Sequence, residues 1–160
     1  MDIFEYALQM EKDGENFYRE IAENTDNKGL KTIVTMLANE EVKHYQAIER
    51  MKQDQYEMAE TSILNNAKNI FVQMKEEAEE FDSDLEQTKL YRKAQEIEKQ
   101  SQQFYQSKAD QLDNENQKRL FEQLAKEEEK HYFLLENIID LVSRPQQWLE
   151  NAEWHHLEEY

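Results

Sequence analysis

The sequence has no cysteine among its 160 residues, and glycine and proline are scarce. Without cysteine, the chain cannot form a disulfide, a zinc ribbon, an iron–sulfur cluster or a cysteine-ligated iron site of its own. Two glycines and one proline leave few places for tight turns, whereas Glu, Gln, Lys, Ala and Leu are abundant. This composition predicts an all-α protein of one domain, with apolar side chains gathered in stripes along the helices.

Positive charge and long apolar runs are also lacking. The formal net charge of −17 would repel a phosphate backbone and an anionic membrane surface. No run of residues approaches the length of a membrane span, and the first residues, Met1 to Glu5, lack the basic and apolar regions of a secretion signal. We therefore expect no nucleic-acid partner, no membrane partner and a cytoplasmic location.

An internal repeat organises what is present. Shifting the sequence by 87 residues aligns 2–51 with 89–138 without a gap, and 17 of the 50 aligned positions are identical. Apolar residues in each copy recur at steps of three and four, which is typical of amphipathic helices. Each copy is therefore predicted to be a helical hairpin, with Asp26-Asn27 and Asp113-Asn114 as the turn and helix-capping residues.

The two hairpins, about 2–54 and 84–143, predict a four-helix bundle over 1–143. We expect both copies to begin at the same end, so that the crossover, 55–83, returns the chain across the bundle. A helical piece over 65–80 is expected within it, around Ile70, Phe71 and Met74. Pro145 is predicted to end the fourth helix, and 144–160 to form a tail with a short amphipathic helix.

Four glutamates and two histidines fall inside the apolar stripes, where core residues are expected: Glu11, Glu41, His44, Glu98, Glu128 and His131. The Glu-x-x-His spacing of the second and fourth helices places carboxylate and imidazole on one face, one turn apart. Each glutamate lies fifteen residues from the centre of its turn, at Asp26 or Asp113. At 1.5 Å per residue all four stand roughly 22 Å from their turns, which predicts a single layer.

Four buried carboxylates repel one another unless cations neutralise them, and two divalent ions would balance the charge. One Glu from each of two helices and a Glu-x-x-His from each of the other two form the dinuclear site of di-iron carboxylate bundles. Iron or manganese suits this donor set, and zinc could occupy it adventitiously. The symmetrical assignment is Glu11 and His44 for one metal, Glu98 and His131 for the other, and Glu41 and Glu128 as bridges.

Other residues are candidates for supporting this site. Each histidine should donate its second N–H to an acceptor, for which Glu40 and Glu127 are candidates across the bundle, unless they are surface charges. Tyr18 and Tyr105 are either hydrogen-bonded to the ligands or core aromatics.

Gly14 and its repeat partner Ser101 are small, and each follows a ligand glutamate by one turn. They either leave room for O₂ or peroxide or allow close helix packing.

Four segments resemble the ligand motifs of the rubrerythrin-like branch of the ferritin-like superfamily: Met10–Tyr18, Ala38–His44, Ile97–Tyr105 and Ala125–His131. The resemblance covers about 1–143. It implies a ferritin-like bundle, two iron ions, and an oxidoreductase that acts in oxidative stress as a peroxidase, reducing hydrogen peroxide or O₂. It also implies a homodimer.

Two features depart from rubrerythrins proper. A rubredoxin domain is absent from the sequence, so electrons must come from an external donor such as a rubredoxin or a flavoprotein. Ser101 stands where the family carries an additional ligand glutamate, which makes the site resemble the six-ligand site of bacterioferritins. Ferroxidation for iron storage or delivery, a metal-stabilised interaction module, and catalase-like chemistry with manganese therefore remain alternatives.

Overall fold

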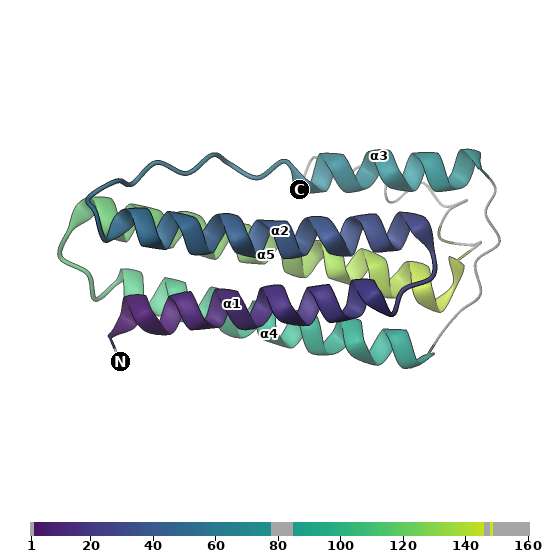
Figure 1. Cartoon of the computed structure of the whole chain (residues 1–160), viewed down its shortest axis with the longest axis horizontal. Coiled ribbons are helices and arrows are strands. Elements are labelled where there is room, and N and C mark those ends of the chain that lie inside the picture. Colours follow the sequence, from purple (N-terminus) through teal and green to yellow (C-terminus); the bar gives the residue numbers. More distant parts are fainter. Residues whose placement is uncertain (1, 78–84, 146–147, 149–160) are drawn as a thin grey trace.

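The structure, a computed structural model, describes residues 2–77, 85–145 and 148. These residues form five helices: α1 (Ile3–Glu23), α2 (Lys28–Met51), α3 (Ile63–Glu76), α4 (Leu85–Ala109) and α5 (Glu115–Ser143). α1 packs chiefly on α2, and α4 chiefly on α5, so two hairpins form a four-helix bundle (Figure 1). The predicted all-α bundle is confirmed. Within the described residues, no helix is long and apolar enough to cross a bilayer.

The predicted capping residues begin the second helix of each hairpin. The Asn27 side chain accepts a hydrogen bond of 2.9 Å from the backbone N–H of Leu30. The Asn114 side chain accepts one of 3.0 Å from Gln117 in the same manner. Both contacts satisfy a backbone donor that the first helical turn leaves free.

The prediction that both hairpins begin at the same end is wrong. α1 begins at the left of Figure 1, whereas α4 begins at the right. Arg50 at the end of α2 and Asp54 just beyond it accordingly line one hollow with Asn116 at the start of α5. Because α2 already returns the chain to the end where α1 begins, the chain must cross to the opposite end between Met51 and Leu85. The long crossover is thus needed for hairpins with opposite directions.

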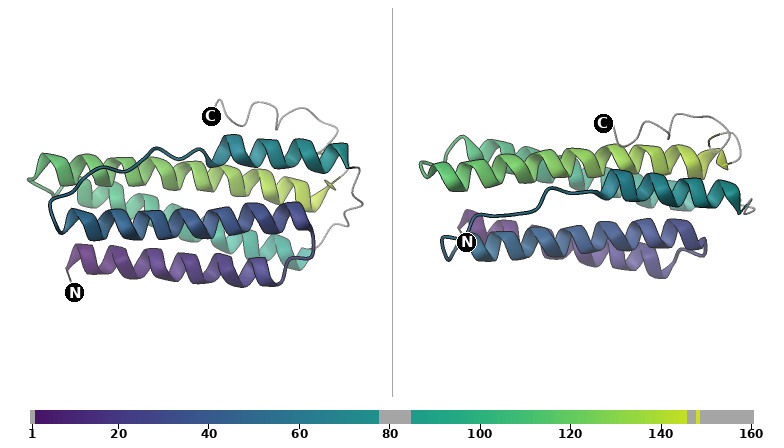
Figure 2. Two further views of the ribbon diagram at one scale, coloured as in Figure 1. Left: turned by 45° about the horizontal axis from the view of Figure 1, so that its top comes forward. Right: turned by 90° about the horizontal axis from the view of Figure 1, so that it is seen from above.

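α3 occupies the second part of this crossover and lies beside α2 and α5 (Figure 2). It begins two residues before the predicted helix and ends at Glu76; residues 78–80 of that prediction lie outside the described residues. Phe71 of α3 is buried and meets the ring of Trp148 edge-on at a centroid distance of 4.7 Å. The predicted tail helix lies outside the described residues apart from 144, 145 and 148.

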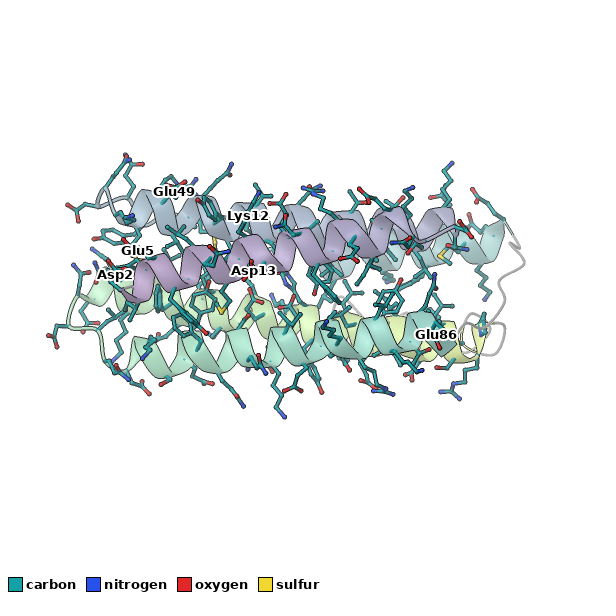
Figure 3. All side chains as sticks on the ribbon, turned by 60° about the horizontal axis from the view of Figure 1, so that its bottom comes forward. Asp2, Glu5, Lys12, Asp13, Glu49 and Glu86 are labelled. Carbon is teal, nitrogen blue, oxygen red and sulfur yellow. The ribbon has the colours of Figure 1, made fainter. Side chains whose placement is uncertain are left out.

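Two apolar clusters form the core, one toward each end of the bundle. The larger contains Leu30, Leu37, Phe71 and Leu135. The smaller contains Ile48, Phe121 and Leu124. Charged side chains such as Glu5, Lys12 and Glu49 lie on the outside (Figure 3).

Candidate metal centre

The six predicted ligands form one buried layer. Each of the four main helices of the bundle supplies at least one of them. The exposed fractions are 1% for Glu11, Glu98 and Glu128, 4% for Glu41, and 0% for His44 and His131. Ionisable residues are rarely buried to this degree unless they are paired or bind metal.

The ligand atoms divide into two groups that share two carboxylates. One group is Glu11, Glu41, His44 and Glu128, and the other is Glu41, Glu98, Glu128 and His131. Within each group, the atoms that could bind an ion lie within 4.8 Å of one another. This division matches the predicted one, with Glu41 and Glu128 common to both groups.

The imidazole nitrogens face the carboxylates directly. His44 Nδ1 lies 2.8 Å from Glu128 Oε1 and 3.4 Å from Glu11 Oε1. His131 Nδ1 lies 3.5 Å from Glu98 Oε1 and 3.6 Å from Glu41 Oε1. The two rings are nearly parallel, with centroids 5.5 Å apart.

Each of the six side chains has one buried donor or acceptor atom that makes no well-formed hydrogen bond among the described residues, although His44 Nδ1 and Glu128 Oε1 face each other at 2.8 Å. These atoms are Glu11 Oε2, Glu41 Oε1, His44 Nδ1, Glu98 Oε2, Glu128 Oε1 and His131 Nδ1. Buried polar atoms are nearly always satisfied, because leaving one unpaired costs about 1–3 kcal/mol. Six such atoms in one layer fit metal ions that would use them as ligands. Four carboxylates and two imidazoles also form a donor set that suits iron or manganese.

The outer nitrogens of both histidines contact carboxylates across the bundle. His44 Nε2 lies 2.8 Å from Glu127 Oε1, and His131 Nε2 lies 3.4 Å from Glu40 Oε1. An Nε2–H that donates to these acceptors leaves Nδ1 free to bind metal. Glu40 and Glu127 thus lie behind the two histidines, with Glu127 buried and Glu40 partly exposed.

Both tyrosines hydrogen-bond to carboxylates of the layer, each in the opposite hairpin. The hydroxyl of Tyr18 donates to Glu98 Oε1 and that of Tyr105 donates to Glu11 Oε1, both at 2.5 Å. Each contact occupies one carboxylate oxygen and leaves the other unpartnered. Both hydroxyls remain protonated, because burial and the nearby carboxylates raise the pKa of Tyr18 and Tyr105 well above the usual value.

These contacts are reciprocal. Tyr18 and Tyr105 are equivalent in the repeat, and so are Glu98 and Glu11, so the two tyrosine contacts are copies of each other. The contact of His44 with Glu127 likewise corresponds to that of His131 with Glu40. Reciprocal contacts define an approximate two-fold axis between the hairpins. Since equivalent helices run in opposite directions, this axis is perpendicular to the bundle and passes through the layer. The layer predicted from equal distances to the turns therefore forms even though the hairpin directions were predicted wrongly.

Two residues of the second layer escaped the sequence prediction. The backbone N–H of Thr61 donates to Glu127 Oε2 at 3.1 Å, and its hydroxyl donates to Glu40. Lys43 Nζ lies 3.2 Å from Glu127 and 3.6 Å from Glu40. Lys43 recurs in both repeat copies and so carried a signal, whereas Thr61 lies in the crossover, outside the repeat.

The electrostatics of the metal-free layer favour bound protons. Burial and the neighbouring carboxylates raise the pKa of Glu41 and Glu128 well above the usual value. Burial alone would raise the pKa of Glu98. Hydrogen bonds with Glu128, His131 and Tyr18 and the charge of His131 outweigh burial and lower this pKa to about 2. Burial alone would lower the pKa of both histidines. The carboxylate of Glu11 faces His44 and that of Glu98 faces His131, and these charges raise both histidine pKa values well above the usual value. Protons thus provide part of the positive charge that the carboxylates need.

The helical bundle and its layer of four carboxylates and two imidazoles define a ferritin-like protein with a candidate dinuclear metal site. The chain belongs to the rubrerythrin family, whose sequence pattern it matches over residues 2–139. A hypothetical protein from Pyrococcus furiosus, Pfu-1136390-001, has a similar solved structure, with a TM-score of 0.67, 21% identity and 88% of each chain covered. This likeness shows the fold. No curated protein sequence matches the chain.

Proposed function

We propose that the protein is a non-haem di-iron oxidoreductase of rubrerythrin type, which reduces hydrogen peroxide or O₂ with electrons from an external donor. Membership of the rubrerythrin family supports a di-iron protein. The observation that carries the proposal is the set of six buried candidate ligand atoms that make no well-formed hydrogen bond and converge in two groups.

Iron ions held in the layer would supply the redox chemistry, since two Fe(II) provide the two electrons that convert H₂O₂ and two protons into two waters. Glu11 and Glu98 would bind through the oxygen that their tyrosine leaves free. Glu127 and Glu40 orient His44 and His131 so that Nδ1 points into the layer. The apolar clusters on both sides exclude water from the carboxylates and strengthen these electrostatic contacts.

The proposal is tested by loading the metal-free protein with Fe(II) under anaerobic conditions and mixing it with peroxide. We expect two iron ions per chain and one peroxide consumed per pair of iron ions. Added reductant, such as reduced rubredoxin or a reduced flavoprotein, should give repeated turnover. Peroxide that persists unchanged beside fully loaded protein would contradict the proposal. The same experiment with Mn(II) tests catalase-like chemistry, in which peroxide disappears without a reductant and O₂ is released.

Ferroxidation for iron storage or delivery is the second candidate. It is favoured by Ser101, which stands where the resemblance leads us to expect an additional ligand glutamate. Storage requires a closed shell of many subunits, whereas rubrerythrin-type reduction is compatible with the expected homodimer. Sedimentation distinguishes the two candidates. A large shell that retains Fe(III) supports storage. A dimer that holds no iron mineral and turns over with reductant supports peroxide reduction.

A further inference from the structure

The two halves of the carboxylate layer differ at Gly14 and Ser101, which are equivalent in the repeat. Gly14 is buried in α1, and a Cβ added there would lie 3.1 Å from Glu41 Oε2 and 3.3 Å from its carboxyl carbon. The backbone of α1 thus approaches a shared carboxylate with no side chain between them, an approach that glycine permits. Ser101 places a side chain at the equivalent position.

The two shared carboxylates, Glu41 and Glu128, also differ in solvent exposure. Glu41, beside Gly14, retains 4% of its accessible surface, whereas Glu128 retains 1%. Glu41 is the most accessible of the four carboxylates of the layer. The half of the layer that contains Gly14 and Glu41 is therefore less completely covered than the half that contains Ser101 and Glu128.

A surface hollow lies on this half, between α1 and α4. Its volume is about 440 Å³, and its lining includes Gly14 and Met10 of α1 and Ile97 of α4. Figure 3 looks onto this face, with Asp13, another lining residue, labelled on α1. The hollow therefore reaches from solvent to Gly14, whose backbone packs closely against Glu41 on its other side.

The chemistry of the hollow selects small neutral molecules. Met10, Ile97 and the ring of Tyr6 supply a mainly apolar lining. Gln9 donates a hydrogen bond of 2.9 Å to Asp13, so these two polar side chains pair with each other. The net charge of −17 opposes anions but leaves neutral molecules unaffected.

We propose that a small neutral oxidant, hydrogen peroxide or O₂, reaches the metal layer through this hollow and past Gly14, and that the Ser101 half is closed. Gly14 is then a specificity-determining position, because a Cβ there would press on the Glu41 carboxylate at the inner end of the route. The inference rests on the proposed function, since it names the route to the same site.

The repeat provides matched variants for the test. Gln9→Trp places a large side chain in the hollow without touching Glu41, and Glu96→Trp makes the same change at the equivalent exposed position of α4. Both proteins are loaded with Fe(II), and iron content and melting temperature are checked. Association of nitric oxide, a neutral surrogate for O₂, is then followed by stopped-flow absorbance, alongside peroxide consumption.

We expect Gln9→Trp to slow nitric oxide association about tenfold, within the one to three decades over which association rates vary among mutants of one site. Glu96→Trp should retain the rate of the unmodified protein, with iron content unchanged in both. Equal rates in all three proteins, or equal slowing in both variants, would overturn the route. Asp13→Phe with Gln100→Phe forms a second matched pair, judged by the same comparison, if Gln9→Trp does not fold.

The two proposals fail separately. If the iron-loaded protein does not consume peroxide but Gln9→Trp still slows nitric oxide, the reaction is refuted and the route stands. If peroxide is consumed at one rate by all variants and nitric oxide binding is also unchanged, the reaction stands and the route is refuted.

Discussion

Tyr18 of one hairpin donates a hydrogen bond of 2.5 Å to Glu98 of the other, and the repeat returns the same contact from Tyr105 to Glu11. These two bonds connect the hairpins through the carboxylate layer itself. Assembly of the bundle and positioning of the candidate ligands therefore depend on the same contacts.

Replacing either tyrosine by phenylalanine should destabilise the metal-free protein. The change leaves a buried carboxylate without its donor, and a hydrogen bond to a charged group contributes about 1.5–3 kcal/mol. Tyr18→Phe should also raise the pKa of Glu98 from about 2, because the Tyr18 hydrogen bond is among the contacts that lower it. Chemical denaturation measures the loss. Tyr132→Phe, at an exposed side chain on α5, is the control and should change stability little.

Glu127→Gln should weaken metal binding without unfolding the bundle. Glu127 accepts from His44, and loss of such a partner typically costs 10–100-fold in metal affinity. Calorimetric titration with Fe(II) or Mn(II) measures the effect. Glu129→Gln removes a neighbouring exposed carboxylate and should bind metal as tightly as the unmodified protein. Equal affinities for the two variants would mean that Glu127 does not support His44.

The sequence was sufficient to predict the four bundle helices, both asparagine caps and the two groups of candidate ligands that the fold brings together, because each pattern occurs in both copies of the repeat. It did not predict the direction of the second hairpin, since similarity between two copies does not define the symmetry that relates them. Among the sequence features, only the length of the crossover bears on the direction of the second hairpin. Thr61 could not be predicted either, because its contacts with Glu40 and Glu127 depend on where the crossover packs. The hollow beside Gly14 depends on the spacing of α1 and α4, which no periodic pattern reports.

Glu41→Gln should separate metal binding from folding. In the metal-free protein, burial and the neighbouring carboxylates make ionised Glu41 unfavourable, so a neutral amide should leave stability unchanged or raise it by about 1 kcal/mol. The unmodified protein should gain about 4 kcal/mol when free metal exceeds its dissociation constant a thousandfold, and the variant far less at the same concentration. Denaturation with and without metal tests both statements. Glu49→Gln, an exposed change farther along α2, should retain the full gain. A Glu41→Gln protein that gains as much from metal as the unmodified chain would exclude Glu41 as a ligand.

Metal affinity should rise with pH. The pKa values of Glu41, Glu128, His44 and His131 are raised in the metal-free protein, so these groups hold protons at pH values where free side chains would have lost them. A metal must displace these protons, and each one released changes the apparent affinity by about tenfold per pH unit. The dissociation constant should therefore fall as pH rises toward these raised pKa values. Titration in buffers of different ionisation enthalpy counts the protons directly. An affinity independent of pH, with no proton release, would show that the layer is already deprotonated before metal binds, and that the carboxylates are held together by packing and by the tyrosine hydrogen bonds alone.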